Sequence, residues 1–183
     1  MKTINKALLI GALGLGAYTM QSNEFKYYGM SPFFTKSIIK SQIDQVCFIL
    51  GNGANNNANE LILRTIGIET EFATAKDHSK EYGEGLGQFD RGTFEDTIRR
   101  TRKKDKILIE RHFGINIDIS SYDDLRKNPT FSIIMIRLKY KLIPATIPIY
   151  EAELYSYYKE HYNSIFGAST FDKWLSTNNI RIG

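Results

Sequence analysis

The sequence predicts a mainly α domain, and three observations support that prediction. Apolar residues recur at intervals of three and four along most of the chain, which is the spacing of one helix face. Alternation of apolar and polar residues is nearly absent, with residues 115–119 as the one short example. The 183 residues, of which 42% are hydrophobic, are enough to form one core, and the single cysteine excludes an internal disulfide.

The first 21 residues differ from the rest of the chain. Lys2 and Lys6 precede an uninterrupted run of apolar and small residues at 7–20. The run suits a signal-peptide core better than a spanning helix, which needs about 20 residues. No clean small-x-small cleavage site follows, because the best candidate, residues 17–19, ends in Thr. We therefore expect residues 1–21 to be either a cleaved signal peptide or a retained membrane anchor, with the protein exported to the periplasm or cell envelope or held at a membrane.

The remaining chain divides into a linker and one folded domain. Residues 22–32 are polar and aromatic, which is typical of a linker, and the domain is expected at 33–183. The first helix is indicated by an apolar stripe and ends at Gly51-Asn52-Gly53; the stripe comprises Ile39, Ile43, Val46, Cys47 and Leu50. Cys47 is expected to be a buried hydrophobe rather than a nucleophile. Further helices are expected at about 58–72, from 93 into a cationic stretch, at 121–126, 130–142, 150–162 and 170–175.

Glu69 lies on the second of these helices, for which Asn55 to Asn57 are cap candidates. At roughly 100° per residue, Glu69 shares the inward stripe of Leu61, Ile62, Thr65 and Phe72, whereas Glu71 points away from it. Apolar surroundings disfavour a charged carboxylate, which raises the pKa of the acid. Glu69 is therefore a candidate general acid, and a helix-end ion pair is the alternative.

A glycine-punctuated loop at 77–90 follows this helix and contains Gly83-Glu84-Gly85-Leu86-Gly87-Gln88. A phosphate-binding loop is excluded, because no strand precedes the glycines and no Lys-Ser/Thr pair ends them. We instead expect the loop to form the floor of a cleft. Its backbone amides and the Gln88 amide can hydrogen-bond a polymer there, since glycine permits close approach.

These residues resemble the lysozyme-like, soluble lytic transglycosylase superfamily over roughly residues 58–175. Its Glu-Ser-x-Phe element is similar to Glu69-Thr70-Glu71-Phe72, and its Gly-Leu-Met-Gln element is similar to 85–88, with Gly87 where Met is usual. An aromatic helix ending in Tyr162-Asn163, followed by Gly-x-x-Thr, looks like the third element, in a form more similar to phage and prophage members.

The resemblance implies an α-rich lysozyme-like domain with a cleft between two helical lobes, and it makes Glu69 the catalytic acid and base. It also implies that the cleft is lined by Gly85, Leu86, Gln88, Tyr162 and Asn163, with Tyr162 near the acid or the sugar N-acetyl group. The substrate would be the peptidoglycan glycan strand. For Tyr155, Tyr158 and Tyr162, which share one helical stripe, core packing is the alternative role.

Two chemistries at the glycosidic bond stay open. A lytic transglycosylase needs one carboxyl group, which protonates the glycosidic oxygen and then deprotonates the muramoyl 6-hydroxyl, closing a 1,6-anhydro ring. A muramidase needs a second carboxylate to hold water. Asp90 and Asp77 are the main candidates, because goose-type lysozymes end this loop with Gln-x-Asp, as 88–90 does; Glu81 and Glu84 also lie in the loop.

The net charge and the positions of the histidines limit which classes of partner and cofactor we expect. The net charge of +4 favours acidic partners in general. The cationic run at 99–106 is expected to be a solvated helix face, and no aromatic interleaving supports nucleic-acid binding. His78, His112 and His161 show no metal-ligand spacing, so we expect neither a metal nor another cofactor. A non-enzymatic, glycan-binding component of a virion or envelope assembly, with other virion or envelope proteins as partners, remains the rival function.

Overall fold

The computed structural model describes residues 36–73, 83–163 and 169–177, and every regular element in these ranges is a helix. This confirms the mainly α prediction. The N-terminal segment 1–21, the linker 22–32 and Asp77 lie outside the described residues. Among the described helices, none has the length and apolar character needed to cross a membrane.

The observed helices agree with the expected ones to within three residues at most ends. They are α2 (Lys36–Leu50), α3 (Ala58–Thr70), α4 (Arg91–Arg100), α5 (Lys103–Phe113), α6 (Asp124–Lys127), α7 (Pro129–Lys141), α8 (Glu151–His161) and α9 (Phe171–Ser176). The buried residues of α2 are the five predicted from its apolar stripe, and Cys47 is one of them. Burial raises the pKa of the Cys47 thiol to about 11, which fits its expected structural role.

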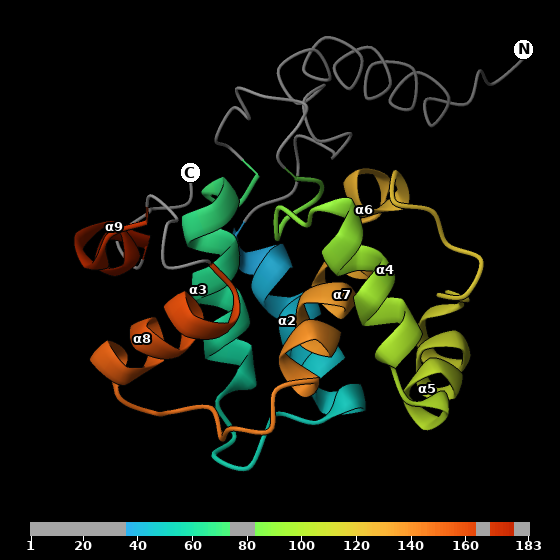
Figure 1. Ribbon diagram of the computed structural model, residues 1–183, viewed down its shortest axis with the longest axis horizontal. Coiled ribbons are helices and arrows are strands. Elements are labelled where there is room, and N and C mark those ends of the chain that lie inside the picture. The colour runs from blue at the N-terminus through green and yellow to red at the C-terminus, as the bar shows by residue number, and fades with distance from the viewer. Residues whose placement is uncertain (1–35, 74–82, 164–168, 178–183) are drawn as a thin grey trace, which may run out of the picture.

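Helices α2, α3 and α7 form the centre of the molecule (Figure 1). The innermost is α7, in which every residue from Phe131 to Leu138 is buried. A helix that is buried on all sides needs neighbours on all sides, and α7 contacts α2, α3, α4 and α6. Asn128 caps its first turn by accepting a hydrogen bond of 3.0 Å from the Phe131 amide, with Pro129 in the first helical position.

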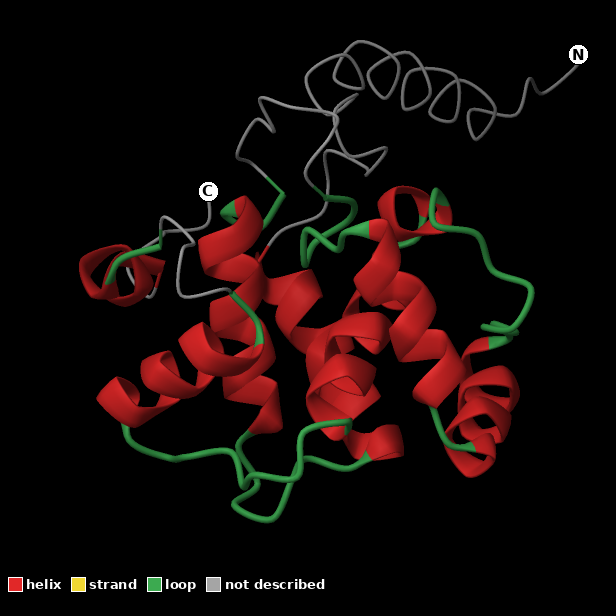
Figure 2. Cartoon of the chain, viewed as in Figure 1, coloured by secondary structure: helices red, strands yellow, loops and turns green. Residues whose placement is uncertain are grey.

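The remaining helices flank this centre on two sides (Figure 2). In the view of the figures, α8 and α9 lie on one side, and α4, α5 and α6 lie on the other. The end of α3 that carries Glu69 and the loop that precedes α4 both lie at the upper side in this view. Residues far apart in sequence are therefore brought together there.

The start of α3 is capped differently from the prediction. Asn57 occupies the cap position, but its side chain makes no cap hydrogen bond and donates instead to the Pro148 carbonyl at 2.7 Å. Asn55 likewise donates to the Ile147 carbonyl. The capping acceptor is Oδ1 of Asn52, which lies 2.8 Å from the Asn59 amide. The predicted cap residues thus tie α3 to the segment before α8, and the cap comes from further upstream.

The end of α3 comes two residues earlier than predicted. Glu71, Phe72 and Ala73 all have positive φ angles, of 48°, 58° and 68°. Left-handed conformations of this kind end a helix, and they are uncommon for residues other than glycine. The chain turns away directly after Glu69 and Thr70, so Glu69 lies in the last turn of the helix.

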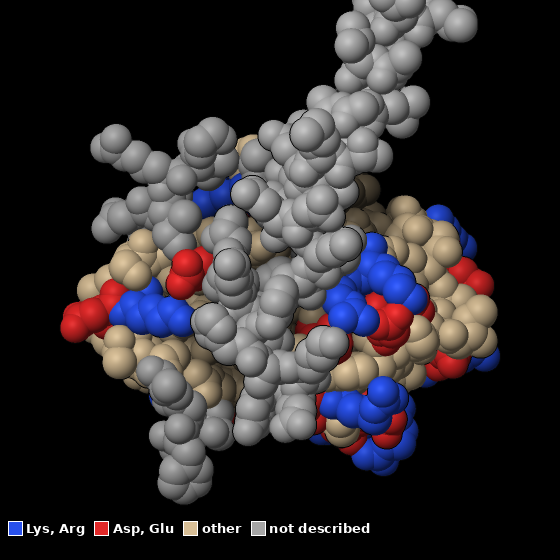
Figure 3. Space-filling model, turned by 90° about the horizontal axis from the view of Figure 1, so that it is seen from above, with Lys and Arg blue, Asp and Glu red and all other residues tan. Residues whose placement is uncertain are grey.

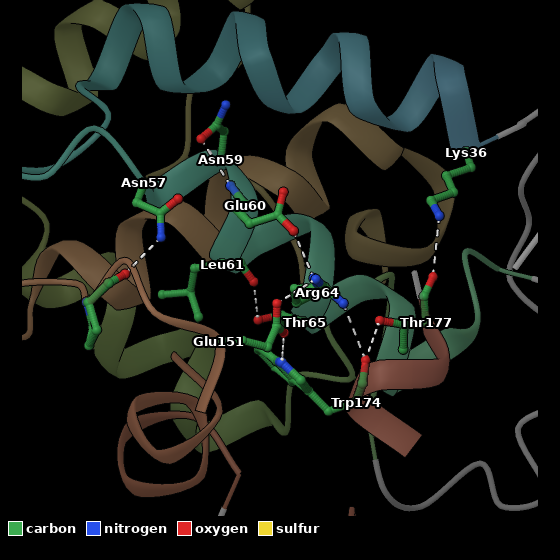
Figure 4. Close-up of polar contacts among 11 residues, drawn as sticks. Lys36, Asn57, Asn59, Glu60, Leu61, Arg64, Thr65, Glu151, Trp174 and Thr177 are labelled. Carbon is green, nitrogen blue, oxygen red and sulfur yellow. Dashed lines mark hydrogen bonds and ion pairs between the residues drawn. The ribbon is translucent and has the colours of Figure 1, made fainter. Parts of the chain in front are cut away.

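A buried guanidinium fastens the C-terminal helices to α3 (Figure 4). Arg64 is 4% exposed and forms ion pairs of 2.7 Å with Glu60 and with Glu151 at the start of α8. Glu151 also accepts a hydrogen bond from the indole of Trp174, which lies in α9 and is fully buried. Lys36 of α2 donates to the Thr177 carbonyl at the end of α9. These contacts fix α8 and α9 beside the end of α3.

The cationic run was expected to continue the helix that begins near residue 93, but the structure divides it between α4 and α5. Thr101 and Arg102 adopt extended backbone angles and break the helix. The break redirects the chain so that Asp105, which is 3% exposed, pairs with Lys141 of α7 at 2.8 Å. Elsewhere in the run, Asp96 pairs with Arg99 and Arg100. On the face of the molecule drawn in Figure 3, Lys and Arg side chains likewise lie beside Asp and Glu side chains.

Candidate active site

Glu69 is held at the end of α3 by a tyrosine from α8. The Tyr158 hydroxyl donates a hydrogen bond of 2.7 Å to Glu69 Oε1. The side chain of Glu69 is only partly accessible. Glu71 is exposed, as predicted, although it lies just beyond the end of α3 in a left-handed conformation. The neighbouring Thr65 and Ile66 are fully buried. Glu69 is therefore a carboxyl group at the boundary between the core and the surface.

Burial dominates the electrostatics of Glu69. Desolvation raises the pKa of its carboxyl group above the ordinary value of 4.5, because the charged form is the one that loses hydration. The Tyr158 hydrogen bond and the positive charges of Lys139, Lys173 and Lys159 act in the opposite direction and limit the rise. A raised pKa keeps a proton on the carboxyl group at higher pH, which is the property a general acid needs.

The Tyr158 hydroxyl is itself held by the side-chain amide of Asn163. Nδ2 of Asn163 donates to Tyr158 Oη at 2.9 Å and to the Ser169 hydroxyl at 2.6 Å. The Tyr158 ring is 1% exposed and packs against Trp174, with 5.1 Å between ring centroids. Core packing and a polar contact with Glu69 are thus combined in one residue, because the ring is buried while the hydroxyl reaches the carboxylate.

The loop at 83–90 is anchored to the core through its backbone. Glu84 and Phe89 exchange two backbone hydrogen bonds and form a short antiparallel bridge. The Leu86 amide donates to the Ser132 hydroxyl at 2.8 Å, and its carbonyl lies 3.3 Å from the Thr70 hydroxyl. The Leu86 side chain is fully buried. Leu86 therefore holds the loop against α3 and α7, and its polar backbone groups are already used.

Gly85 and Gly87 permit this close packing, each for a different reason. Gly85 has φ of 72°, and a Cβ there would meet the Ser132 hydroxyl and the Leu125 carbonyl. A Cβ on Gly87 would clash with the Tyr162 hydroxyl, which donates to the Gly87 carbonyl at 2.7 Å. The tyrosine thus fills the place in which a side chain at position 87 would lie. This explains a glycine where the resemblance leads one to expect Met.

Tyr162 and Gln88 both lie at the glycine loop. Among the residues that the structure describes, neither of them forms a hydrogen bond with Glu69. The Tyr162 hydroxyl is used by Gly87, and its ring stacks on Tyr158 with centroids 6.0 Å apart. The half-buried Gln88 donates from Nε2 to the Gly85 carbonyl at 3.1 Å. The hydroxyl beside the candidate acid is that of Tyr158, one helical turn before the tyrosine that the resemblance indicated.

Lys139 of α7 lies against the same group of residues. Its ammonium group is 3.7 Å from the centroid of the Tyr162 ring and donates to the Tyr162 carbonyl at 3.2 Å. Burial lowers the pKa of Lys139 to about 8, against the attraction of Glu69 and Asp90. Lys139 is therefore a partly buried cation that interacts electrostatically with both carboxyl groups.

Asp90 is exposed and caps α4. Its Oδ1 accepts a hydrogen bond of 2.7 Å from the Thr93 amide, and its Oδ2 accepts one of 2.6 Å from the Thr93 hydroxyl. Although desolvation raises it, the pKa of Asp90 is lowered overall by these hydrogen bonds and by Lys139. Asp90 is thus an ionised carboxylate with a structural role as a helix cap, near the cation that also interacts with Glu69.

A cavity of about 350 Å³ lies between α4, α7 and α8, beside Lys139. Its walls include Thr93, Asp96, Arg100 and His161, so they offer hydroxyl groups and charges of both signs, with Asp96 paired to Arg100. Within the ranges that the structure describes, no three His, Cys, Asp or Glu side chains form a group that could hold a metal ion.

The structure brings together residues that the sequence analysis singled out separately. Glu69, Asn163 and the glycine loop converge through Tyr158, Thr70 and Tyr162. Tyr158 and Lys139 were not predicted as site residues. The tyrosine stripe was the available signal for Tyr158, whereas Lys139 had none, because a lysine among apolar residues near a helix end usually reaches solvent.

No protein-family model, curated protein or solved structure matches the chain.

Proposed function

We propose that the protein is a peptidoglycan lytic transglycosylase that cleaves the β-1,4 bond between N-acetylmuramic acid and N-acetylglucosamine. The observation that supports this most strongly is the partly buried Glu69, which receives a hydrogen bond from Tyr158 and lies beside the glycine loop. Burial raises the pKa of the carboxyl group, so it can donate a proton. The order of sequence elements resembling the transglycosylase superfamily agrees with this role.

In the proposed reaction, Glu69 donates its proton to the glycosidic oxygen as the bond from that oxygen to the muramoyl C1 breaks. The Glu69 carboxylate then takes the proton of the muramoyl 6-hydroxyl while O6 bonds to C1. The products are a free 4-hydroxyl and a 1,6-anhydro ring, and Glu69 is protonated again. The cations Lys139, Lys159 and Lys173 favour the intermediate carboxylate.

The glycan would lie across the end of α3 and the loop at 83–90, in a cleft of a lysozyme-like fold. The cavity beside Lys139 would take a further part of the polymer. Gln88 would contact the glycan from the exposed part of its side chain. Gly85 and Leu86 would shape the loop rather than contact the sugar through side chains, because Leu86 is fully buried.

The proposed site of action is the bacterial cell envelope, in a phage-type system for cell-wall penetration or lysis. This rests on residues 1–21 as an export signal or membrane anchor and on the family resemblance. Fractionation of the full chain and of a chain starting at Asn23 tests it. If residues 1–21 are retained, we expect the full chain to stay in the membrane fraction after carbonate extraction and the shortened chain to be released. Carbonate-resistant membrane association of the shortened chain would contradict the proposal.

The Glu69→Gln variant tests the catalytic assignment. The amide keeps the shape of the side chain but cannot donate the acidic proton, so we expect activity to fall by about 10²- to 10⁴-fold with folding retained. A zymogram containing purified peptidoglycan, with circular dichroism as the folding control, measures both. Glu71→Gln is the matched control, because Glu71 is exposed on the same turn. Clearing by Glu69→Gln at the rate of the parent would refute Glu69 as the catalytic acid. A parent protein that binds peptidoglycan but clears none would instead favour a glycan-binding structural protein.

A further inference from the structure

We infer that Asn163 is a positioning residue, which directs the Tyr158 proton to Glu69 Oε1 and so places the acidic proton of Glu69 on Oε2. The inference rests on the proposed function for its catalytic consequence. It assigns Asn163 a role different from the substrate contact that the family resemblance implies. The geometry behind it is the chain of hydrogen bonds from Ser169 through Asn163 and Tyr158 to Glu69.

The direction of this chain follows from the chemistry of each group. An amide nitrogen only donates hydrogen bonds, and Nδ2 of Asn163 uses its two protons on Tyr158 and Ser169. Tyr158 Oη therefore accepts from Asn163, and its single proton is left for another acceptor. That acceptor is Glu69 Oε1, at 2.7 Å.

The protonation of Glu69 is then restricted to one oxygen. Because Oε1 accepts the Tyr158 proton, a proton on Oε1 would face the hydroxyl proton and lose this hydrogen bond. The acid consequently carries its proton on Oε2. A general acid whose proton always lies on the same oxygen needs no rearrangement before it transfers that proton, so fixing it favours catalysis.

The far end of the chain is fixed as well. Ser169 also receives a contact of 3.4 Å from the Lys159 ammonium, and its carbonyl accepts a hydrogen bond of 2.9 Å from the Tyr155 hydroxyl. Lys159 and Tyr155 are both on α8, which carries Tyr158 too. The residue after the segment 164–168 is thereby held against α8, and with it the partner that orients the Asn163 amide.

Substitution of Asn163 by aspartate tests the direction of the chain. A carboxylate at this position has nearly the same shape but accepts hydrogen bonds, so it would take the Tyr158 proton from Glu69. Glu69 would lose the hydrogen bond that lowers its pKa and would gain a nearby negative charge. For Asn163→Asp we expect the pKa of Glu69 to rise by at least about one unit and kcat to fall by at least about tenfold, with KM changed less than twofold.

The pKa is measured on the resting protein by carbon NMR of labelled glutamate side chains, with Glu69→Gln used to assign the signal. Asn163→Ala is the matched variant, because it removes the donor without adding an acceptor and should give a smaller shift. In the Tyr158→Phe background, Asn163→Ala should change the Glu69 pKa by less than about 0.3 units, since the pathway through the hydroxyl is gone.

The outcomes separate this inference from the proposed function. An unchanged Glu69 pKa in Asn163→Asp overturns the inference, and so does an increase in KM alone, which would make Asn163 a substrate contact. A shifted pKa in a protein that leaves peptidoglycan intact would support the hydrogen-bond chain and refute the proposed function. An equal effect of Asn163→Ala with and without the Tyr158 hydroxyl would also overturn the inference.

Discussion

The Tyr158 hydroxyl donates a hydrogen bond of 2.7 Å to Oε1 of Glu69 and so joins α8 to α3 across 89 positions of sequence. The ring of the tyrosine belongs to the core and its hydroxyl belongs to the candidate site. The position of the carboxyl group thus depends on the packing of the C-terminal helices. Arg64, Glu151 and Trp174 stabilise that packing through the ion pair of the buried Arg64 with Glu151 and the hydrogen bond of Trp174 to the same carboxylate.

Replacement of this hydroxyl should move the pH dependence of activity. In Tyr158→Phe, Glu69 loses a hydrogen bond that lowers its pKa, so the pKa of the acid rises further above 4.5. Because the protonated acid is the active form, activity should persist to higher pH, while kcat falls about tenfold as the carboxyl group loses its positioning.

Release of soluble fragments from peptidoglycan as a function of pH measures this effect. Tyr157→Phe is the control, because its hydroxyl donates to the Ala145 carbonyl at 3.1 Å and does not contact Glu69. A loss of activity at the same pH in Tyr158→Phe and in the parent would show that the hydroxyl does not influence the acid.

The contact between Gly87 and Tyr162 predicts a stability effect. In Gly87→Ala, the added methyl group would meet the Tyr162 hydroxyl and Ile136, whose Cγ1 would lie 2.7 Å away. Overpacking of this kind costs about 1–3 kcal/mol of unfolding free energy. Urea denaturation measures the change. Gly92→Ala is the control, because Gly92 is exposed, lacks a positive φ angle, and an added Cβ would have only Asp90 Oδ1, at 3.3 Å, within 4 Å.

A double variant identifies the cause of that cost. Tyr162→Phe removes the clashing oxygen, so Gly87→Ala should destabilise the protein less in the Tyr162→Phe background than in the parent. An equal cost in both backgrounds would mean that the tyrosine does not account for the glycine.

Lys139 predicts a specific pH dependence of stability. Its pKa is about 8 in the folded protein and 10.5 ordinarily, so between these values the unfolded chain binds more protons than the folded one. The cost of burying the charge is fully present below pH 8 and disappears as the pH rises toward 10.5. Lys139→Met removes this cost, and its advantage in unfolding free energy over the parent should therefore shrink from pH 7 to pH 10.

Urea denaturation at the two pH values measures this difference. The exposed Lys40, which pairs with Asp44 at the surface, provides the control variant Lys40→Met. An advantage of Lys139→Met that stays the same, or grows, from pH 7 to pH 10 would show that the Lys139 charge is not destabilised by burial.

The helices could be predicted from the sequence because their signals are local. The apolar stripe of α2 identifies its five buried residues, and Pro129 marks the start of α7. The break between α4 and α5 could not be predicted, since the run from Arg99 to Lys106 has no glycine or proline. Asp105, just after the break, is buried and pairs with Lys141, which is 36 positions away, and a local pattern does not reveal such a contact.

Some features of the candidate site could likewise be predicted from the sequence, and others could not. The inward position of Glu69 follows from helical geometry, and the structure agrees with it. The tyrosine that contacts Glu69 could not be predicted, because Tyr155, Tyr158 and Tyr162 share one stripe. Only the packing of α8 against α3 determines that Tyr158 reaches the carboxyl group. The interaction of Lys139 with Glu69 likewise depends on tertiary packing, which brings α7 against the end of α8.

A catalytic role of Asp90 can be tested separately from its structural role as the cap of α4. Asn is as good a cap as Asp, so Asp90→Asn should fold normally, with Thr93 still able to donate to the side-chain oxygen. If Glu69 works without a second carboxylate, activity in this variant should be retained within about threefold. If Asp90 holds an attacking water, activity should fall by orders of magnitude instead.

The products of peptidoglycan digestion test the central claim most directly. Mass spectrometry of the released muropeptides distinguishes 1,6-anhydro ends from reducing ends, which are about 18 mass units heavier because water has been added. We predict anhydro ends from the parent protein and from Asp90→Asn, and none from Glu69→Gln. Reducing ends that predominate in the parent and are lost in Asp90→Asn would contradict the account and identify a muramidase that uses Glu69 and Asp90 together.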